Sequence, residues 1–329
     1  MDKPQIKNLL QQRRYVEAKE ACVRLCEQWP QDAEAWFLLG AIHGQLGNFP
    51  DAERSCRAAL RLQPTQSVLH YNLAIALINQ QKIEDAIQHL RDAIRFNPQY
   101  AEAHTDLGNA LQILGRHKEA LASYDQAIHY KPEAAATYFN AGNANREIQQ
   151  WDKAITCYQR AIELQPDLVA AYIELGRILI RQYRLQDAIG LLGKALVKLP
   201  DAAEIHFNLG IAYQEHGEAD KALACYQRVL GIDPGHEGAQ ASIAGILGFQ
   251  GKYEAARTLL LPLLHRSNPD LTAVITYGNF AHRFNAEDDA ISRIDDALRM
   301  DNLPADTRVK LHFAIAKILD RRNQYETAF

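Results

Sequence analysis

The sequence predicts an all-α protein, an α-solenoid built from antiparallel helix pairs. Three residue registers share one constant period across most of the 329-residue chain. Alanine recurs in steps of 34 from 18 to 290, glycine or alanine recurs from 40 to 278, and proline recurs at 30, 64, 98, 132, 166, 200 and 234. Such a period is typical of an array in which each unit buries its apolar face against its neighbours.

Each unit is expected to contain two helices, and residues 101–134 show the pattern. Apolar and small residues at offsets of three and four predict the first helix: Ala103, His104, Leu107, Gly108 and Leu111. A second set predicts the second helix: Ala120, Tyr124, Ala127 and Ile128. Gly115 separates them, because glycine adopts the left-handed conformation that ends a helix. Pro132 ends the second helix. The small residues predict a close helix crossing.

The two ends of the array depart from this pattern. Residues 1–32 have a good second helix but a short first one, so we expect an N-terminal capping or degenerate repeat. Residues 33–304 are expected to form eight repeats, and residues 305–329 a partial repeat. Ala328 lies beyond the position that the register of Ala290 predicts, which indicates an insertion. Because Phe329 comes directly after Ala328, we expect a longer natural polypeptide and a C-terminal helix with an unpaired apolar face.

Composition argues against several classes of function. The 36 basic and 40 acidic residues give a net charge of −4, without the basic stripe of a nucleic-acid-binding protein. No apolar run is long enough for a membrane span, and the first residues do not form a signal peptide. Five cysteines without metal-ligand spacing are typical of reduced thiols. We therefore expect a cytoplasmic protein that binds neither nucleic acid nor membrane.

The sequence contains no recognisable catalytic motif. No glycine-rich phosphate loop is present, and His236-Glu237 lacks the second histidine of a zinc helix. Three histidines share the register of Trp36 and Tyr138, which predicts packing between repeats: His70, His104 and His206. Cys22 shares the register of Cys56 and so favours the core. We expect no cofactor, no metal site and no catalysis within this chain. Whether a longer natural polypeptide would be an enzyme stays open.

The repeated unit resembles the tetratricopeptide repeat, which has an aromatic residue, Leu-Gly, and then alanines and proline at fixed offsets. Residues 33–66 match it with Trp36, Leu39, Gly40, Ala52, Ala59 and Pro64. Residues 135–168 match it with Tyr138, Gly142, Ala154, Tyr158, Ala161 and Pro166. The resemblance covers nearly the whole chain and implies a right-handed superhelix whose first helices line a concave groove. It does not identify a partner, since the fold serves many unrelated partners.

Two polar columns lie opposite the buried stripe of the first helices. One column reads Asn72, Asp106, Asn140, Glu174 and Asn208, and the neighbouring column includes Asn109, Asn143 and Arg177. An asparagine amide offers an acceptor and two donors, so such a ladder can bind an extended peptide backbone. Asn72, Asn140 and Asn208 resemble the asparagine ladder of the O-linked N-acetylglucosamine transferase superhelix. With Arg181, these residues form the expected peptide-binding groove.

Two simpler interpretations of these columns stay open. Exposed helix positions tolerate polar residues without any ligand, so a single asparagine is weak evidence for a site. The aromatic residues beside the ladder either form apolar pockets or pack between adjacent repeats: Phe37, Tyr71, Phe139 and Phe207. Acidic residues outnumber basic ones in the expected groove, which favours a polar or mildly basic partner.

The leading functional hypothesis is a non-enzymatic scaffold that binds an extended peptide or a partner helix in its groove. A second hypothesis is a substrate-recruiting region of a longer enzyme, such as a sulfotransferase or glycosyltransferase. Residues 311–329 resemble the last repeat before the catalytic region of bacterial tetratricopeptide-containing sulfotransferases. A third hypothesis is self-association through the C-terminal helix, because an unpaired apolar face tends to find a partner.

Overall fold

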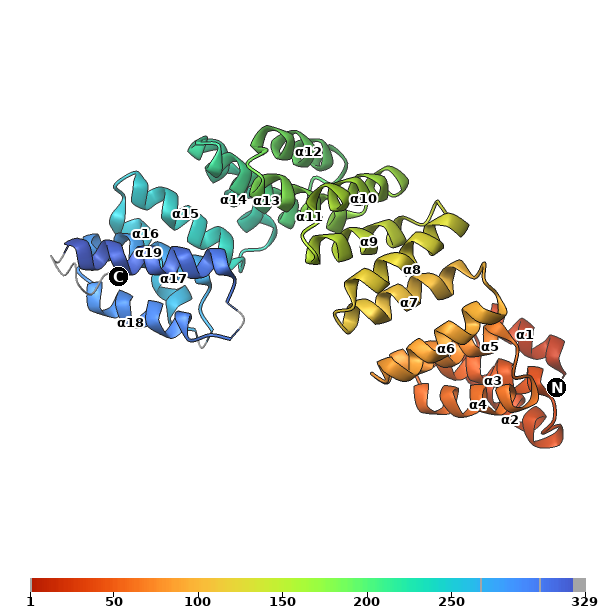
Figure 1. The fold of residues 1–329 in the computed structure, drawn as a ribbon. Coiled ribbons are helices and arrows are strands. Elements are labelled where there is room, and N and C mark those ends of the chain that lie inside the picture. Colours follow the sequence, from red (N-terminus) through yellow and green to blue (C-terminus); the bar gives the residue numbers. More distant parts are fainter. Residues whose placement is uncertain (1, 267, 302, 322–329) are drawn as a thin grey trace. The chain divides into compact units, whose positions relative to one another are not determined.

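The computed structural model describes residues 2–266, 268–301 and 303–321. Within these ranges every regular element is an α-helix, which confirms the predicted all-α class (Figure 1). The chain divides into two compact units, Met1–Ala171 and Tyr172–Phe329. The second helix expected to open at Ala328 lies outside the described residues, and the division into a cap, eight repeats and a partial repeat stays a prediction.

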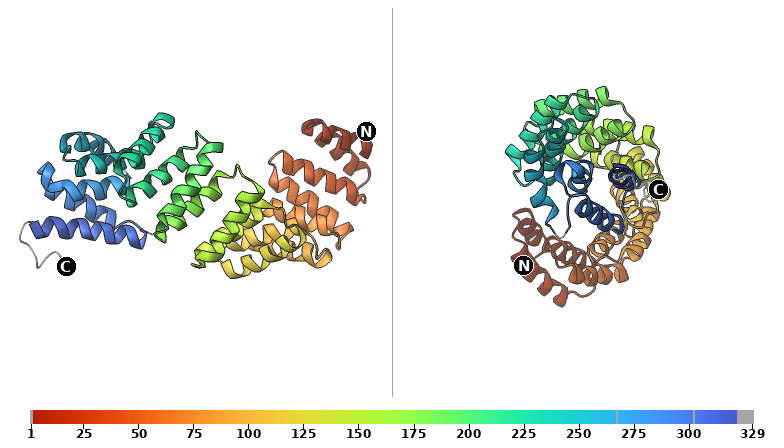
Figure 2. Two further views of the ribbon diagram at one scale, coloured as in Figure 1. Left: turned by 90° about the horizontal axis from the view of Figure 1, so that it is seen from above. Right: turned by 90° about the vertical axis from the view of Figure 1, so that its left-hand side faces the viewer.

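The first unit consists of helices that alternate as the first and second members of pairs. They are α1 (Lys3–Gln11), α2 (Tyr15–Gln28), α3 (Ala33–Gln45), α4 (Phe49–Leu62), α5 (Ser67–Ile78), α6 (Ile83–Phe96), α7 (Ala101–Ile113), α8 (His117–Tyr130), α9 (Ala135–Glu147) and α10 (Trp151–Leu164). Helix α11 (Val169–Arg181) begins in this unit and continues in the second. Consecutive helices of the first unit lie side by side in both orientations of Figure 2.

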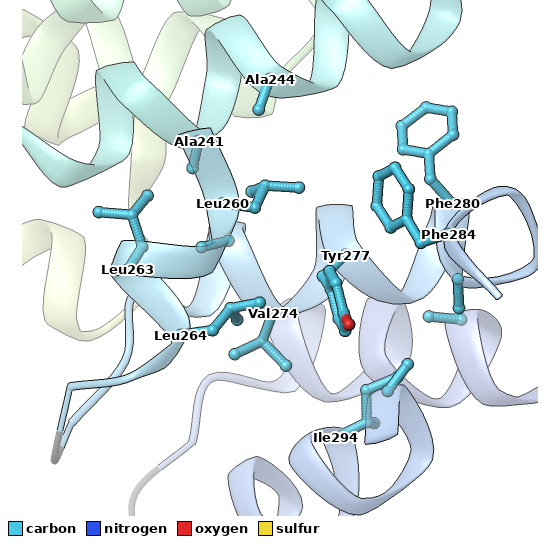
Figure 3. Close-up of a cluster of buried hydrophobic side chains, with 14 of the residues drawn as sticks. Ala241, Ala244, Leu260, Leu263, Leu264, Val274, Tyr277, Phe280, Phe284 and Ile294 are labelled. Atoms are coloured by element: carbon cyan, nitrogen blue, oxygen red, sulfur yellow. The ribbon is translucent and has the colours of Figure 1, made fainter. Parts of the chain in front are cut away.

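The second unit continues the alternation and ends in a longer helix. Its helices are α12 (Leu185–Lys198), α13 (Ala203–Glu215), α14 (Ala219–Ile232), α15 (Glu237–Phe249), α16 (Tyr253–Leu264), α17 (Leu271–Phe284), α18 (Glu287–Leu298) and α19 (Ala305–Arg321). Side chains from α15, α16, α17, α18 and α19 form one buried hydrophobic core in the C-terminal part of this unit (Figure 3). Leu260, Tyr277 and Ile294 are among its buried members.

A left-handed residue follows the first helix of each pair at one fixed position. Gly115, which the sequence predicts to separate two helices, has φ of +71°. Non-glycine residues take the same conformation in other repeats, and within the described part of the chain the series steps by 34: Arg13, Gly47, Gln81, Gly115, Gln149, Tyr183, Gly217, Gly251 and Asn285. The turn geometry is therefore constant while the residue varies, so glycine alone reveals only some of the turns.

The two helices of a pair approach most closely where a glycine or alanine on the first helix faces a larger side chain on the second. A Cβ atom added to Gly108 would lie 2.4 Å from the Tyr124 ring. The same relation joins Gly142 to Tyr158 and Gly210 to Tyr226, with added Cβ atoms 2.6 Å from the ring in both. Leucine replaces the tyrosine in other repeats: one of them has alanine opposite it, in the pair Ala74 and Leu90, and another keeps glycine, in the pair Gly176 and Leu192.

Among the described residues, no helix combines the length and the apolar character needed to cross a membrane. Helix α19 is the longest of the described helices, and it carries charged residues at several turns.

Gly108→Ala is expected to destabilise the first unit by about 1–3 kcal/mol, because the new methyl group overlaps the Tyr124 ring. In a Tyr124→Leu background the same change should cost much less, as in the natural pair Ala74 and Leu90. Urea unfolding of the four chains in this double-mutant cycle measures the coupling. Gly190→Ala on α12 is the control, since nothing lies within 4 Å of its added Cβ. Purely additive effects would contradict the packing argument.

Candidate functional site

The buried tyrosines at the helix crossings determine where the predicted asparagines point. The Tyr124 hydroxyl donates to Asn109 Oδ1 at 2.8 Å, with Gln112 Oε1 at 2.9 Å as an alternative acceptor. One repeat later, the Tyr158 hydroxyl donates to Asn143 Oδ1 at 2.8 Å. Asn109 and Asn143 therefore have a structural function, because a buried hydroxyl without an acceptor is costly.

A chain of hydrogen bonds crosses three consecutive first helices of the first unit. Tyr71 on α5 donates to Asp106 Oδ2 on α7 at 2.8 Å. Asn109, also on α7, donates from Nδ2 to Asp106 Oδ1 at 3.2 Å, and Asn140 on α9 donates to Asn109 Oδ1 at 2.8 Å. The structure thus brings together three of the predicted site residues, Asp106, Asn109 and Asn140, and adds Tyr71, which was expected only as a packing residue or pocket wall.

Asp106 is the charged centre of this chain of hydrogen bonds. Burial raises the pKa of its carboxyl group, and the nearby carboxylate of Glu102 acts in the same direction. Hydrogen bonds from Tyr71 and Asn109 oppose the rise in this pKa because they stabilise the ionised form. Burial, together with Asp106, raises the pKa of the Tyr71 phenol, so this hydroxyl stays protonated and donates.

The amides retain part of their hydrogen-bonding capacity. Asn109 Oδ1 accepts from both Tyr124 and Asn140, which uses its two lone pairs. Within the described contacts, one N–H of Asn109 and one N–H of Asn140 have no partner, and the Asn143 amide group donates to none. Asn72 lies half-buried on α5, one position after Tyr71. The row can therefore still exchange hydrogen bonds with a ligand.

The predicted residues of the second unit have contacts of other kinds. Glu174 accepts from Arg177 at 3.2 Å, the i, i+3 ion pair that occurs on many helix surfaces. Arg181 lies 3.9 Å from Asp306 of α19. Asn208 is only 1% exposed, and its amide donates to the Glu204 carbonyl oxygen of its own helix at 2.7 Å. A ligand therefore reaches Asn208 only if this side chain is uncovered.

The aromatic column packs against neighbouring rings. Tyr71 contacts Tyr100, the residue directly before α7, at a centroid distance of 4.9 Å. Phe139 packs on Tyr158, and Phe207 packs on Tyr226 and His236. Phe37 packs against the buried cluster formed by α1, α2 and α3. These contacts favour the packing interpretation of the column over apolar pockets.

The sequence pattern did not reveal one recurring contact, in which a side-chain donor reaches the proline carbonyl six residues before it. In three repeats the donor is histidine Nε2 at 2.9 Å, and in two others Trp36 and Gln240 replace it at 2.9 and 2.8 Å: the pairs are Trp36–Pro30, His70–Pro64, His104–Pro98, His206–Pro200 and Gln240–Pro234. These histidines were expected to pack between repeats, and each hydrogen bond joins its histidine to the proline at the end of the preceding repeat.

The cysteines lie in or beside the core. Cys22 is buried in the cluster formed by α1, α2 and α3, as expected, and its Sγ atom lies 3.3 Å from the Ala35 carbonyl oxygen. Cys26 is buried in the same cluster. Burial raises the pKa of the Cys56 thiol to about 12. A thiol with such a pKa is a poor nucleophile near neutral pH.

Tyr71→Phe should destabilise the first unit by about 1.5–3 kcal/mol at pH 7, because it removes a hydrogen bond to an ionised, half-buried carboxylate. The bond stabilises the ionised form of Asp106, so its contribution is full above the raised folded pKa of Asp106 and decreases as pH falls through it. Urea unfolding at pH 7 and pH 4 measures this difference. Tyr130→Phe is the control, and an equal loss at both pH values would contradict the assignment.

Family models for this repeat match most of the chain. A model described as TPR repeat matches residues 76–115 and 142–182. Models described as tetratricopeptide repeat match residues 4–67 and 173–237, residues 101–134 and residues 55–88. Together the matches cover residues 4–134 and 142–237.

Solved structures of the same architecture are similar to large parts of the chain. The C-terminal part of a TPR repeat-containing protein from Cytophaga hutchinsonii aligns with a TM-score of 0.62 at 16% identity, covering 73% of this chain and 98% of that one. PilF of Pseudomonas aeruginosa gives 0.53 at 18% identity, covering 67% and 97%. YrrB, a TPR protein with an unusual peptide-binding site, gives 0.50 at 22% identity, covering 57% and 97%. At these identities the likeness shows the fold alone.

In the comparison with curated proteins, no sequence matches the chain. The family assignment rests on the constant period of the sequence, the paired helices with their small-residue crossings, and the matched models. By these criteria the chain belongs to the tetratricopeptide repeat family.

Proposed function

We propose that this chain is a protein-interaction scaffold whose first unit binds an extended peptide along the polar row of α5, α7 and α9. The row consists of Asn72, Asp106, Asn109, Asn140 and Asn143. The observation that carries the proposal is the hydrogen-bond chain from Tyr71 through Asp106 and Asn109 to Asn140. It holds polar side chains of three repeats in fixed orientations before any ligand arrives, which lowers the entropic cost of binding.

The chemistry of the row suits a peptide backbone. Amide N–H groups and carbonyl oxygens alternate along an extended peptide, and the spare donors and acceptors of Asn72, Asn140 and Asn143 can pair with them irrespective of side chains. The similar protein YrrB has a peptide-binding site of its own. A peptide ligand is thus in keeping with what a protein of this fold can bind.

Charge favours a peptide that carries a basic residue or a free N–H donor near Asp106. Glu102 already pairs with Lys131 at 2.7 Å, whereas Asp106 has no ion-pair partner among the described residues. A cation close to Asp106 would lower its raised pKa and so gain binding energy from a half-buried charge. Such charge complementarity at Asp106 determines which peptides bind more than it determines how tightly they bind.

Asn72→Ala should weaken peptide binding about three- to tenfold, the effect of one net hydrogen bond, with little change in melting temperature. Asn140→Ala should weaken binding similarly but also lower stability, because it removes the bond to Asn109. The probe is a fluorescent linear peptide enriched from a random display library on the whole chain, and fluorescence polarisation gives Kd. Gln126→Ala, an exposed amide on the second helix α8, is the matched control.

If the site binds the peptide backbone, affinity should depend more on the backbone N–H groups of the same peptide than on its side chains. Replacing single amides by esters should weaken binding more than replacing most side chains by alanine, because an ester lacks the N–H donor. If no linear peptide is enriched, or if Asn72→Ala binds as tightly as the unaltered chain, the proposed groove is wrong.

We also propose that α19 mediates self-association with a second copy of the chain. Val309 and Phe313 lie one helical turn apart and are 66% and 67% exposed, while Leu311, Ala314 and Ile318 on the other face are buried in the core. Two large apolar side chains on one exposed helix face form the kind of surface that associates.

Phe313→Glu should abolish a concentration-dependent increase in mass, because it places a charge on the exposed apolar face of α19. Sedimentation velocity over a range of protein concentrations measures the change. Val197→Glu on α12 is the control, since Val197 is 84% exposed but lies on another helix. A chain that stays monomeric at all concentrations would exclude self-association through α19.

A further inference from the structure

Two histidines and one aspartate meet where α5 packs on α6, and neither the repeat pattern nor the proposed peptide site accounts for all three. His70 lies on α5, and His89 and Asp92 lie three residues apart on one face of α6. The Nδ1 atoms of the two histidines are 3.2 Å apart, and Asp92 Oδ2 is 3.9 Å from His70 Nδ1. The three potential ligand atoms lie within 4.8 Å of one another.

The His70 ring is held with one lone pair directed at this cluster. Its Nε2 atom lies 2.9 Å from the Pro64 carbonyl oxygen, which can only accept, so Nε2 carries the proton and Nδ1 presents its lone pair. A stacked contact with Phe96, at a centroid distance of 5.4 Å, also fixes the ring. A backbone carbonyl that orients the far nitrogen is the usual outer-shell partner of a metal-binding histidine.

His89 is suited to act as the second ligand. Its side chain is half-buried beside His70, and the centroids of the two rings are 5.4 Å apart. A neutral imidazole is the form that binds metal ions. Without an ion, His89 Nδ1 donates to His70 Nδ1. With an ion, the proton of His89 moves to Nε2 and both Nδ1 lone pairs face the metal.

The nearby cations have partners that leave a ligand atom available. Arg57 is held by Glu53 at 2.8 Å. Arg95 lies 3.0 Å from Asp92 Oδ1, whereas Oδ2 is the oxygen that faces His70. Asp92 can therefore keep its ion pair through one oxygen and bind a metal through the other, as ligating carboxylates with outer-shell partners do.

We propose that His70, His89 and Asp92 bind one divalent transition-metal ion, with Zn²⁺ as the best fit. Tetrahedral zinc with Zn–N bonds of about 2.0–2.1 Å places two nitrogen ligands about 3.3 Å apart. The observed 3.2 Å between the histidine nitrogens matches this separation. The Asp92 carboxylate is partly exposed, and its Oδ2 atom must move about half an ångström closer to His70 Nδ1 to reach the same separation. All three ligand atoms already lie within 4.8 Å of one another.

An adjoining cavity leaves room for the fourth ligand. It has a volume of about 340 Å³ and is lined by Arg57, Leu60, Arg61, Pro64, His70, Leu73 and His89. Three protein ligands with one open position is the arrangement in which zinc binds water or a group from another molecule.

The repeats themselves supply an internal comparison. His104 has the same contact with a proline carbonyl as His70, but the next repeat has Ser123 and Gln126 at the positions of His89 and Asp92. In the preceding repeat they are Ser55 and Ala58. The structural role of the histidine position thus explains His70 Nε2 but not the two ligands gathered around Nδ1. No metal site was expected here from the sequence, because His70 and His89 lie on different helices, 19 positions apart.

Isothermal titration of the full chain, freed of metal by a chelator, with ZnCl₂ tests the proposal, and we expect one zinc ion per chain. His70→Gln should weaken zinc binding by at least about 10–100-fold, more than loss of an outer-shell partner costs. It should still fold, because Gln240 makes the same proline contact in its own repeat. His89→Ser with Asp92→Gln, the residues of the next repeat, should have the same effect.

Two further measurements make the assignment specific. His129→Ser with Asp125→Gln removes a histidine and an aspartate from the exposed surface of α8 and should leave zinc binding unchanged. Cobalt bound in place of zinc should show no thiolate-to-metal charge-transfer band. Absence of zinc binding, unchanged binding in both site variants, or a thiolate band that puts the ion on cysteine would overturn the proposal.

Discussion

The close crossing of the two helices in each repeat is the constraint on which the rest of the structure depends. A glycine on the first helix receives the face of a large side chain from the second helix, as Gly108 does for Tyr124. The first helix can approach its partner closely only where that position lacks a bulky group. Glycine faces each of the tyrosines 124, 158 and 226, and it also faces Leu192 and Cys56 in other repeats. Ala74 and Leu90 occupy the same two positions in the repeat between 67 and 100.

This packing has a direct consequence for the candidate site. A tyrosine buried at the crossing brings a hydroxyl that needs an acceptor, and Asn109 and Asn143 on the first helices supply it. Two members of the apparent ligand-binding ladder are thus required by the core. The asparagines that lack such a tyrosine, Asn72 and Asn140, are the better measure of binding.

The fold was predictable from the sequence because each structural event recurs with the same period. Proline, alanine and small-residue registers locate the helices, and Gly115 locates a turn. The turns at Gln81, Gln149 and Tyr183 could not be predicted, since their left-handed conformation is imposed by the repeat geometry rather than favoured by the residue. The burial of Asn208 and the bond between Tyr71 and Asp106 depend on side-chain orientation, which periodicity does not determine.

The same repeat geometry also helps to separate structural from functional residues. A position whose contact recurs, such as the donor to the proline carbonyl, is explained by the fold even when it is a histidine. Another explanation is needed for a polar atom that takes no part in the recurring contact. It is needed most where only one repeat places further polar side chains around that atom. His70 Nδ1, facing His89 and Asp92, meets this criterion, and so does Asp106, whose half-buried charge has no counterpart in the neighbouring Asn72 and Asn140. Because the other repeats keep the fold without these groups, exchanging residues between repeats changes the chemistry while the helix packing is retained.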